Sequence, residues 1–175
     1  MKKLLRYYVG DLFLTRRFYA LAGTLSVLFL VRFFVPALGG MPFVLLLAAL
    51  AAVGADYFLL FLTRGGISGS RDCPERFSNG DPNTVTLVLE SRYGFGIRAV
   101  VIDEIPAQFQ KRDLGFSISL PAAGSRRLSY LLRPVRRGSY QFGYVRVYAA
   151  TPLGWLRRRF TVAGEQAVKV YPAFL

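Results

Sequence analysis

No histidine occurs in this chain of 175 residues, and Cys73 is its only cysteine. Without histidine, the Ser-His-Asp and Cys-His catalytic arrangements and most zinc-site patterns are excluded. A single cysteine cannot form an internal disulfide, which agrees with a reducing compartment. We therefore predict no catalytic residue, no cofactor and no metal site. An enzyme of unrecognised type is the weakest of the functions considered below.

Two apolar stretches dominate the first third of the chain. They run over 18–38 and 41–62 and meet at a segment rich in Pro and Gly, residues 36–42. A membrane-spanning helix needs roughly 20 mostly apolar residues, and Pro and Gly break helices. The pattern predicts a transmembrane helical hairpin.

The charges that flank the hairpin indicate its orientation. Basic residues precede the first stretch and follow the second: Lys2, Lys3, Arg6, Arg16, Arg17, Arg64, Arg71 and Arg76. Because positive residues mark the cytoplasmic side, both ends are expected inside. Two alternatives remain: a secretory signal peptide, or a single span over 41–62 with 18–31 lying in the membrane interface.

Two charged residues interrupt the apolar stretches. Arg32 lies late in the first stretch, where its side chain can extend to the outer headgroups. Asp56 falls in the inner third of the second stretch, and its carboxylate is expected to reach Arg16 or Arg17 at the inner surface. Intramembrane acids are functional candidates, but we favour a structural role for Asp56.

The rest of the chain carries a surplus of basic residues. From Arg64 onward there are 17 basic and 8 acidic residues, within a net charge of +13 for the whole chain. This surplus fits a domain that lies beside anionic lipid, where each Lys or Arg contributes about 1 kcal/mol to membrane binding. Nucleic-acid binding is the competing interpretation of the same charge.

Apolar residues alternate with polar ones in several short runs, as in half-buried strands: Val85–Leu89, Leu114–Leu120, Leu128–Leu132, Val145–Val147 and Val168–Val170.

These runs predict an all-β antiparallel sandwich of immunoglobulin-like type. The expected organisation is a basic cytoplasmic or interfacial segment over 1–17, the hairpin over 18–62, a linker over 63–70 and a cytoplasmic β-sandwich over 71–175. Asp103 and Glu104 form an acidic pair at a strand end. Adjacent strand residues point to opposite faces, so we interpret this pair as a solvated loop entrance.

A candidate docking face follows from the alternation near residue 145. If Val145 and Val147 point inward, Phe142, Tyr144, Arg146 and Tyr148 share the outward face, with Arg136 and Arg137 close in sequence. Aromatic and Arg enrichment is typical of protein contact surfaces. Packing on a neighbouring segment and stacking of single-stranded nucleic acid are the alternatives.

Several short motifs, in order, resemble one family. They are Leu14-Thr15-Arg16-Arg17-Phe18, the segments 74–81, 103–109 and 133–140, Thr151-Pro152-Leu153-Gly154 and Val168-Lys169-Val170-Tyr171-Pro172. The chain resembles the N-terminal half of the bacterial membrane proteins called domain of unknown function 58. The resemblance covers nearly the whole chain.

The resemblance implies two spans in a bacterial cytoplasmic (inner) membrane and a β-sandwich that precedes a von Willebrand factor A-like domain. It also implies association with MoxR-type AAA+ ATPases in the assembly or maturation of other complexes. The expected partners are therefore membrane lipid and a protein, either the von Willebrand factor A-like half or the ATPase. No catalytic residue is transferred. Since the sequence stops at Leu175, we expect a fragment, a truncated frame or a separately encoded second half.

Overall fold

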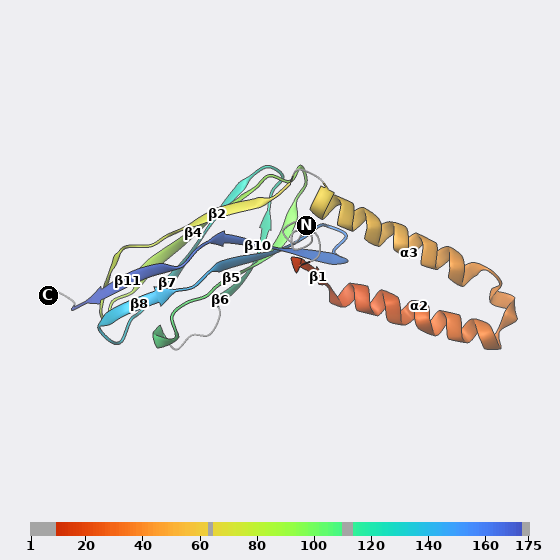
Figure 1. Cartoon of the computed structure of the whole chain (residues 1–175), viewed down its shortest axis with the longest axis horizontal. Helices are drawn as coiled ribbons and strands as arrows, with labels where there is room; N and C mark the ends of the chain where they lie inside the picture. Colours follow the sequence, from red (N-terminus) through yellow and green to blue (C-terminus); the bar gives the residue numbers. More distant parts are fainter. Residues whose placement is uncertain (1–9, 63–64, 110–113, 173–175) are drawn as a thin grey trace. The chain divides into compact units, whose positions relative to one another are not determined.

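The computed structural model in Figure 1 describes residues 10–62, 65–109 and 114–172. It divides into two compact units. The helical unit comprises Met1–Arg64 and Ala150–Arg158, and the β-domain comprises Gly65–Ala149 and Arg159–Leu175. Of the basic residues used to orient the hairpin, Lys2, Lys3, Arg6 and Arg64 lie outside the described residues.

Two helices form the predicted hairpin within the helical unit. α2 covers Arg16–Phe34 and α3 covers Met41–Tyr57; a 3₁₀ turn, η2 (Pro36–Leu38), follows α2, and a π-helical turn, η3 (Phe58–Leu62), continues α3. By length and composition both helices are long and apolar enough to cross a membrane. The predicted pair of apolar helices is confirmed.

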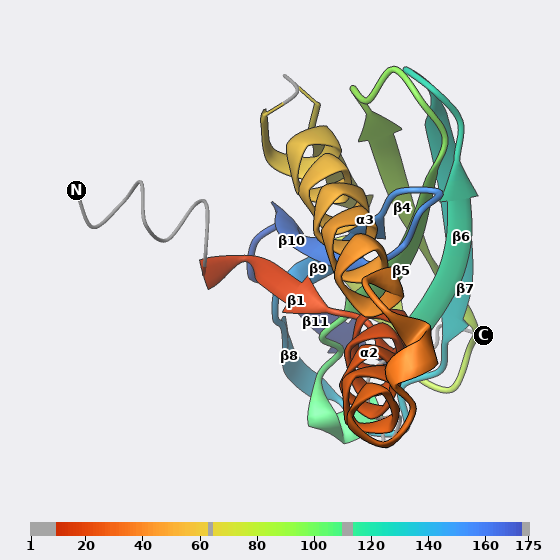
Figure 2. The ribbon, with the colours of Figure 1, turned by 90° about the vertical axis from the view of Figure 1, so that its right-hand side faces the viewer.

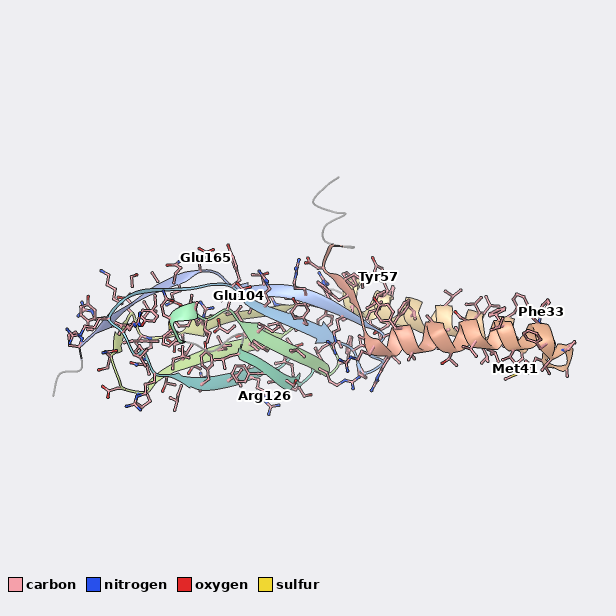
Figure 3. All side chains as sticks on the ribbon, turned by 90° about the horizontal axis from the view of Figure 1, so that it is seen from below. Phe33, Met41, Tyr57, Glu104, Arg126 and Glu165 are labelled. Carbon is pink, nitrogen blue, oxygen red and sulfur yellow. The ribbon has the colours of Figure 1, made fainter. Side chains whose placement is uncertain are left out.

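Local chemistry explains where these helices begin and end. Thr15 is the N-cap of α2, and its hydroxyl accepts a hydrogen bond from the Phe18 amide. Gly39 adopts a φ of +49°, a left-handed conformation that suits glycine, and so allows the chain to reverse. Figure 3 shows Phe33 and Met41 at this end of the hairpin. Here the Arg32 guanidinium lies 4.6 Å from the centre of the Phe43 ring, which joins the two helices.

The segment before α2 also contains a short strand. β1 (Leu12–Leu14) pairs antiparallel with the first residues of β10 (Leu156–Ala163), with Leu14 opposite Leu156 and Leu12 opposite Arg158. Figure 2 shows β1 leading into α2. The sequence predicts only a basic cytoplasmic or interfacial segment over 1–17, so this strand is a feature that the sequence did not indicate. Three residues are too few for periodicity, and only their pairing with β10 makes them a strand.

The β-domain is built from three sets of paired strands. One set has the order β2 (Ile67–Asp72), β4 (Asn83–Ser91), β7 (Ser125–Leu132), and a second has β3 (Arg76–Ser78), β11 (Gln166–Tyr171), β8 (Gly138–Phe142). The third has β9 (Val145–Ala150), β5 (Ile97–Asp103), β6 (Leu114–Leu120), with β10 beside β9. A 3₁₀ turn, η4 (Ala107–Phe109), follows β5. The strands are mostly antiparallel; β3 and β11 are parallel.

Alternating residues of these strands form the core of the β-domain. Most inward positions predicted from sequence are buried, among them Val85, Leu87, Val145, Val147 and Val168. The predicted inward positions of β6 before Leu120, and Leu128 of β7, are only half-buried. β6 and β7 run side by side (Figure 2), and Phe116 of β6 stacks on Tyr130 of β7 with ring centres 5.6 Å apart. The predicted all-β domain after the helices is therefore confirmed, with a β-sandwich-like arrangement.

Two predicted boundaries are wrong. The linker expected over 63–70 is partly strand, because β2 begins at Ile67 and pairs with β4 over six positions. Gly69 permits this pairing, since a Cβ there would lie 2.5 Å from the Val88 carbonyl oxygen. The region 71–175 is also not one uninterrupted unit, because Ala150–Arg158 belongs to the helical unit.

Candidate functional site: the helix-end junction and the outer face of the β-domain

A buried carboxylate organises the end of the helical unit opposite the Gly39 turn. Asp56, near the end of α3, has no exposed surface. Its Oδ2 accepts hydrogen bonds from the backbone amides of Trp155 and Leu156, both at 2.8 Å, and its Oδ1 accepts one from the Thr151 hydroxyl. A carboxylate buried with three donors is well satisfied.

The same turn of chain contacts the start of α2. The Thr15 hydroxyl lies 2.8 Å from the Gly154 carbonyl oxygen, and the Thr15 amide donates to the Trp155 carbonyl at 3.1 Å. Arg17 Nη1 donates to the Leu153 carbonyl at 3.3 Å. We call this set the helix-end junction: Thr15, Arg17, Asp56, Arg158 and the turn Thr151–Leu156.

Arg158 completes the helix-end junction from β10. Its Nη1 donates to the Leu60 carbonyl at 2.7 Å, and its guanidinium lies 4.8 Å from the centre of the Phe61 ring. Leu60 belongs to the π-helical turn η3, whose irregular backbone leaves carbonyl groups for a side-chain donor. The buried arginine therefore satisfies the end of the second helix.

The sequence interpretation of Asp56 needs correction. It was expected to reach Arg16 or Arg17, whereas its carboxylate is bound by neutral donors from Thr151, Trp155 and Leu156. These donors lie 95 to 100 residues further along the chain. The segment Thr151-Pro152-Leu153-Gly154 was identified only as a turn, and its contact with the helices depends on tertiary structure.

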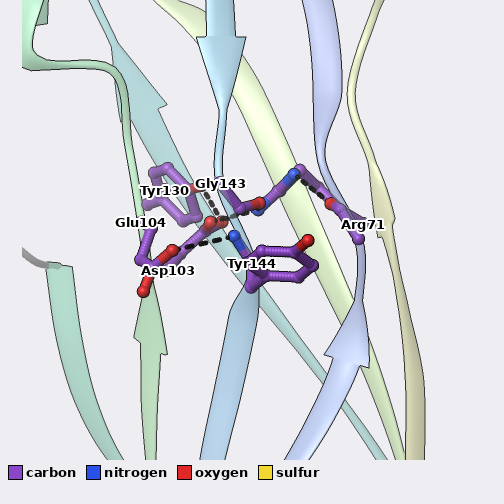
Figure 4. Close-up of polar contacts among 7 residues, drawn as sticks. Arg71, Asp103, Glu104, Tyr130, Gly143 and Tyr144 are labelled. Carbon is purple, nitrogen blue, oxygen red and sulfur yellow. Dashed lines mark hydrogen bonds and ion pairs between the residues drawn. The ribbon is translucent and has the colours of Figure 1, made fainter.

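A second buried polar cluster lies in the β-domain (Figure 4). Arg71 of β2 pairs with Asp103 of β5: Nε donates to Oδ2 at 3.2 Å, and Nη2 forms an ion pair with Oδ1. The Tyr130 hydroxyl of β7 also donates to Asp103. Arg71 donates further to the carbonyl groups of Gly143 (3.0 Å) and Gly164 (3.3 Å).

Two ionisable side chains beside this ion pair have raised pKa values. Burial and the Asp103 charge raise the pKa of the Tyr130 hydroxyl well above its usual range, and burial raises the pKa of the nearby Cys73 thiol. Both groups are thus held neutral near pH 7. The expectation that Asp103 and Glu104 mark a solvated loop entrance is wrong for Asp103, which is fully buried. Sequence alone could not reveal Arg71 as its partner.

The predicted docking face is only partly assembled. Val145 and Val147 are buried, while Tyr144 is 40% exposed and Arg146 and Tyr148 are half-buried. We call Tyr144, Arg146 and Tyr148 the outer face of β9. Glu104 lies beside it, since Glu104 Oε1 is 2.8 Å from Arg146 Nη1 and Glu104 Oε2 accepts from the Tyr144 amide at 3.1 Å.

Phe142 does not belong to the outer face. It is fully buried, and its ring packs against Phe77 and Phe109. The break between β8 and β9 at Gly143 and Tyr144 shifts the alternation by one residue, as a β-bulge does. The Gly143 amide donates to the Glu104 carbonyl at 2.8 Å, and a Cβ at Gly143 would collide with the Glu104 side chain. Glycine is therefore the residue that allows this shift.

The remaining predicted residues lie elsewhere. Arg136 and Arg137 are exposed in the turn before β8. At about 3.3 Å per strand residue, Arg137 is roughly 20 Å from Tyr144 along the chain, so these arginines do not join the outer face. In the part of the chain that the structure describes, no group of three or more His, Cys, Asp or Glu residues is placed to hold a metal ion.

Sequence reasoning missed several residues that these two clusters depend on. Thr15 carried a detectable signal, because Thr before an apolar helix is a favoured N-cap. Trp155 is the only tryptophan and follows a turn, yet nothing local connects it with Asp56. Arg71 was counted only among the basic residues that orient the hairpin.

No protein-family model matches the chain, and neither does any curated protein. Among solved structures, the CARDB domain of a Pyrococcus furiosus protein, solved with di-metal ions, is 12% identical; the match covers 62% of this chain and 96% of that domain, with a TM-score of 0.45. An alkylpurine DNA glycosylase from Pseudomonas fluorescens, bound to DNA with an abasic-site analogue, is 16% identical over 70% of this chain and 36% of its own, with a TM-score of 0.37. A β-glucosidase from Listeria innocua, in complex with gluconolactone, is 14% identical over 64% of this chain and 17% of its own, with a TM-score of 0.31. Similarities at this level assign no function.

Proposed function

We propose that the chain is a membrane-anchored, non-enzymatic scaffold or adaptor that presents the outer face of β9 to a protein partner in the cytoplasm. The observation that carries this proposal is the contrast between two kinds of polar group. The buried carboxylates Asp56 and Asp103 are fully engaged by internal donors. Tyr144, Arg146 and Tyr148 lie together at the partly exposed face of β9, where Arg146 pairs with Glu104.

The hairpin supports the membrane part of the proposal. None of the residues of α2 is buried, and in α3 only Pro42 and Asp56 are buried. A soluble protein rarely exposes apolar surface on this scale, so lipid is the natural surrounding of these helices. The basic flanking residues favour an orientation with both ends in the cytoplasm, and the family resemblance indicates a bacterial inner membrane.

The connections within the β-domain support an immunoglobulin-like sandwich. β2-β4-β7 form one set of paired strands, while β8 pairs with β11 and β9 lies between β10 and β5. β8 and β9 follow each other along the chain with a break of two residues. The turn between β7 and β8 contains a further feature of this fold. The Tyr140 hydroxyl donates to the Arg136 carbonyl at 2.7 Å, as in a tyrosine corner.

The nature of the partner rests on the family resemblance. The expected partners are a von Willebrand factor A-like domain and a MoxR-type AAA+ ATPase, which act in the assembly of other complexes. The alternative function is a basic, membrane-tethered domain that binds nucleic acid or anionic lipid. The two differ in salt dependence, since binding to phosphates weakens steeply with salt.

Truncating the outer face is expected to weaken partner binding without unfolding the β-domain. Truncating an anchor residue in a contact surface to alanine typically lowers the binding free energy by about 2 kcal/mol or more. The double variant Tyr144→Ala, Tyr148→Ala should therefore bind its partner more than roughly tenfold more weakly. The measurement is a titration of the chain with a MoxR-type ATPase and, separately, with a von Willebrand factor A-like domain. Leu131→Ala, an exposed apolar change on β7, is the matched control and should bind normally.

A second substitution tests the inside-outside assignment of β9. Val147 is fully buried, so Val147→Ala should lower the free energy of unfolding by about 2 kcal/mol. If the tyrosine pair unfolds the domain while Val147→Ala does not, the outer face is wrongly assigned. If the tyrosine pair leaves affinity unchanged in a folded protein, the docking role is wrong.

The orientation of the hairpin has its own test. A reporter enzyme active only in the periplasm, fused after Leu175, is expected to give no signal, because the basic flanks retain both ends in the cytoplasm. A fusion placed at Gly40, between the two helices, should be active and provides the control. An active fusion after Leu175 would contradict the cytoplasmic location of the β-domain.

A further inference from the structure

The outside of the helix-end junction has an unusual composition. Arg16, Arg17 and Arg157 are exposed, and Leu153 is 42% exposed beside the exposed Pro152 and the half-buried Trp155. All six belong to the helical unit. We call them the junction rim. Of the acidic residues that the structure describes in this unit, Asp56 is buried and Asp11 is half-buried, so the rim carries a surplus of positive charge.

Hydrogen bonds hold this rim next to the start of α2 and the end of α3. Thr15, which caps α2, is bound to Gly154 and Trp155, while Asp56 of α3 is bound to Trp155 and Leu156. The turn that carries Leu153 and Trp155 is therefore hydrogen-bonded directly to the ends of both helices. If the helices span a bilayer, this turn has to lie at its surface.

Helix lengths indicate where that surface passes. At 1.5 Å per residue, α2 is about 28 Å long and the stretch from Met41 to Asp56 is about 24 Å. A hydrocarbon core is about 30 Å thick, so Thr15 and Asp56 both fall at its edge. Beyond Asp56, Phe58 is still 55% exposed, whereas Leu60 and Phe61 are buried, so the exposed apolar surface of this helix ends within one turn of Asp56.

We infer that the junction rim binds the headgroups of anionic phospholipids, with Trp155 and Leu153 at the boundary between headgroups and acyl chains. The inference rests on the proposed membrane anchor but not on its orientation. Tryptophan is enriched at this depth of the bilayer. Arginine forms paired hydrogen bonds with phosphate oxygens, and three arginines around one turn suit an anionic rather than a zwitterionic headgroup.

The single tryptophan makes the test direct, because Trp155 is the only indole in the chain. The full chain is reconstituted in nanodiscs of phosphatidylcholine mixed with phosphatidylglycerol, with one of the two lipids brominated on its acyl chains. Quenching of Trp155 by each brominated lipid then measures the relative affinity of the two headgroups at the rim. Brominated phosphatidylglycerol is expected to quench more strongly at equal mole fraction, and high salt should reduce the difference.

Charge removal at the rim has a matched control at the other end of the hairpin. Each of Arg16→Gln and Arg157→Gln should lower the preference for phosphatidylglycerol about fivefold, the factor that corresponds to about 1 kcal/mol per arginine. Arg32→Gln, beside Phe43 at the far end of α2, should leave it unchanged. Using two rim variants guards against misfolding of either one.

Two results would overturn the inference. Either equal quenching by both brominated lipids or loss of the preference in Arg32→Gln alone contradicts a headgroup site at the rim. Retention in the membrane after alkaline carbonate extraction separates this failure from failure of the anchor. A chain that stays in the membrane without lipid preference contradicts only the rim site, whereas a chain that is extracted contradicts the proposed anchor itself.

Discussion

Replacing Arg71 with Met is expected to lower the free energy of unfolding of the β-domain by about 3–5 kcal/mol, because Asp103 would remain as a buried charge without its counter-ion. The side chains of this pair are 1% and 0% exposed, so water cannot replace the lost guanidinium. Two backbone carbonyl groups, those of Gly143 and Gly164, would also lose a donor. This is among the largest single-residue effects that the structure predicts.

Cys73 provides the measurement. It is the only cysteine and is 9% exposed, so a thiol reagent is expected to reach it much faster when the β-domain opens. The labelling rate of Cys73 at increasing urea concentration, measured on the full chain in detergent, should rise at a lower urea concentration in Arg71→Met than in the parent. Glu104→Gln, which breaks the ion pair with Arg146, is the matched control. The side chains of this ion pair are 39% and 31% exposed, so the pair contributes no more than about 1 kcal/mol to the free energy of unfolding.

A triple variant separates charge burial from packing. Arg71→Met, Asp103→Leu and Tyr130→Phe together remove all three buried side-chain polar groups of the cluster. Apolar replacement of a complete buried ion pair is often neutral, so the triple variant should be more stable than Arg71→Met alone. If it is equally unstable, loss of packing at Arg71, whose guanidinium lies 4.9 Å from the centre of the Phe142 ring, is the main cause.

Replacing Asp56 with Ala is expected to destabilise the helical unit by about 3–5 kcal/mol, because three donors lose their acceptor in a buried site. Two of them, the Trp155 and Leu156 amides, belong to the turn that also binds Thr15. The turn is therefore expected to detach from α3. Trp155 emission should shift to longer wavelength, and thermal unfolding in detergent should begin at a lower temperature.

Thr24→Ala is the control for the Asp56 prediction. The Thr24 hydroxyl donates only to the Ala20 carbonyl within α2, and exposed substitutions of this kind usually change stability by no more than about 0.5 kcal/mol. Asp56→Asn retains one oxygen acceptor but presents an amide to the Trp155 and Leu156 N–H groups, so its effect should lie between those of the parent and Asp56→Ala. An Asp56→Ala protein with normal Trp155 emission would contradict the role of the carboxylate in holding the turn.

The amino-acid sequence by itself determined the two apolar helices and most of the strand faces. These features depend on composition and period over short windows, such as the apolar stretch of 41–62 or the alternation of Val85 and Leu87. The positions of the turns that contain Gly and Pro also follow from local sequence, because these residues favour particular φ angles. Such signals can be read without knowing what packs against them.

Tertiary structure decided the partners of the buried charges and the exceptions to alternation. Asp56 finds its donors 95 to 100 residues away, and Asp103 finds Arg71 from another strand. The inward position of Phe142 depends on a one-residue shift at Gly143, whose tight approach to Glu104 is a contact between two strands. A buried charge requires a counter-group in space rather than in sequence, and for that reason both polar clusters were visible only in the folded chain.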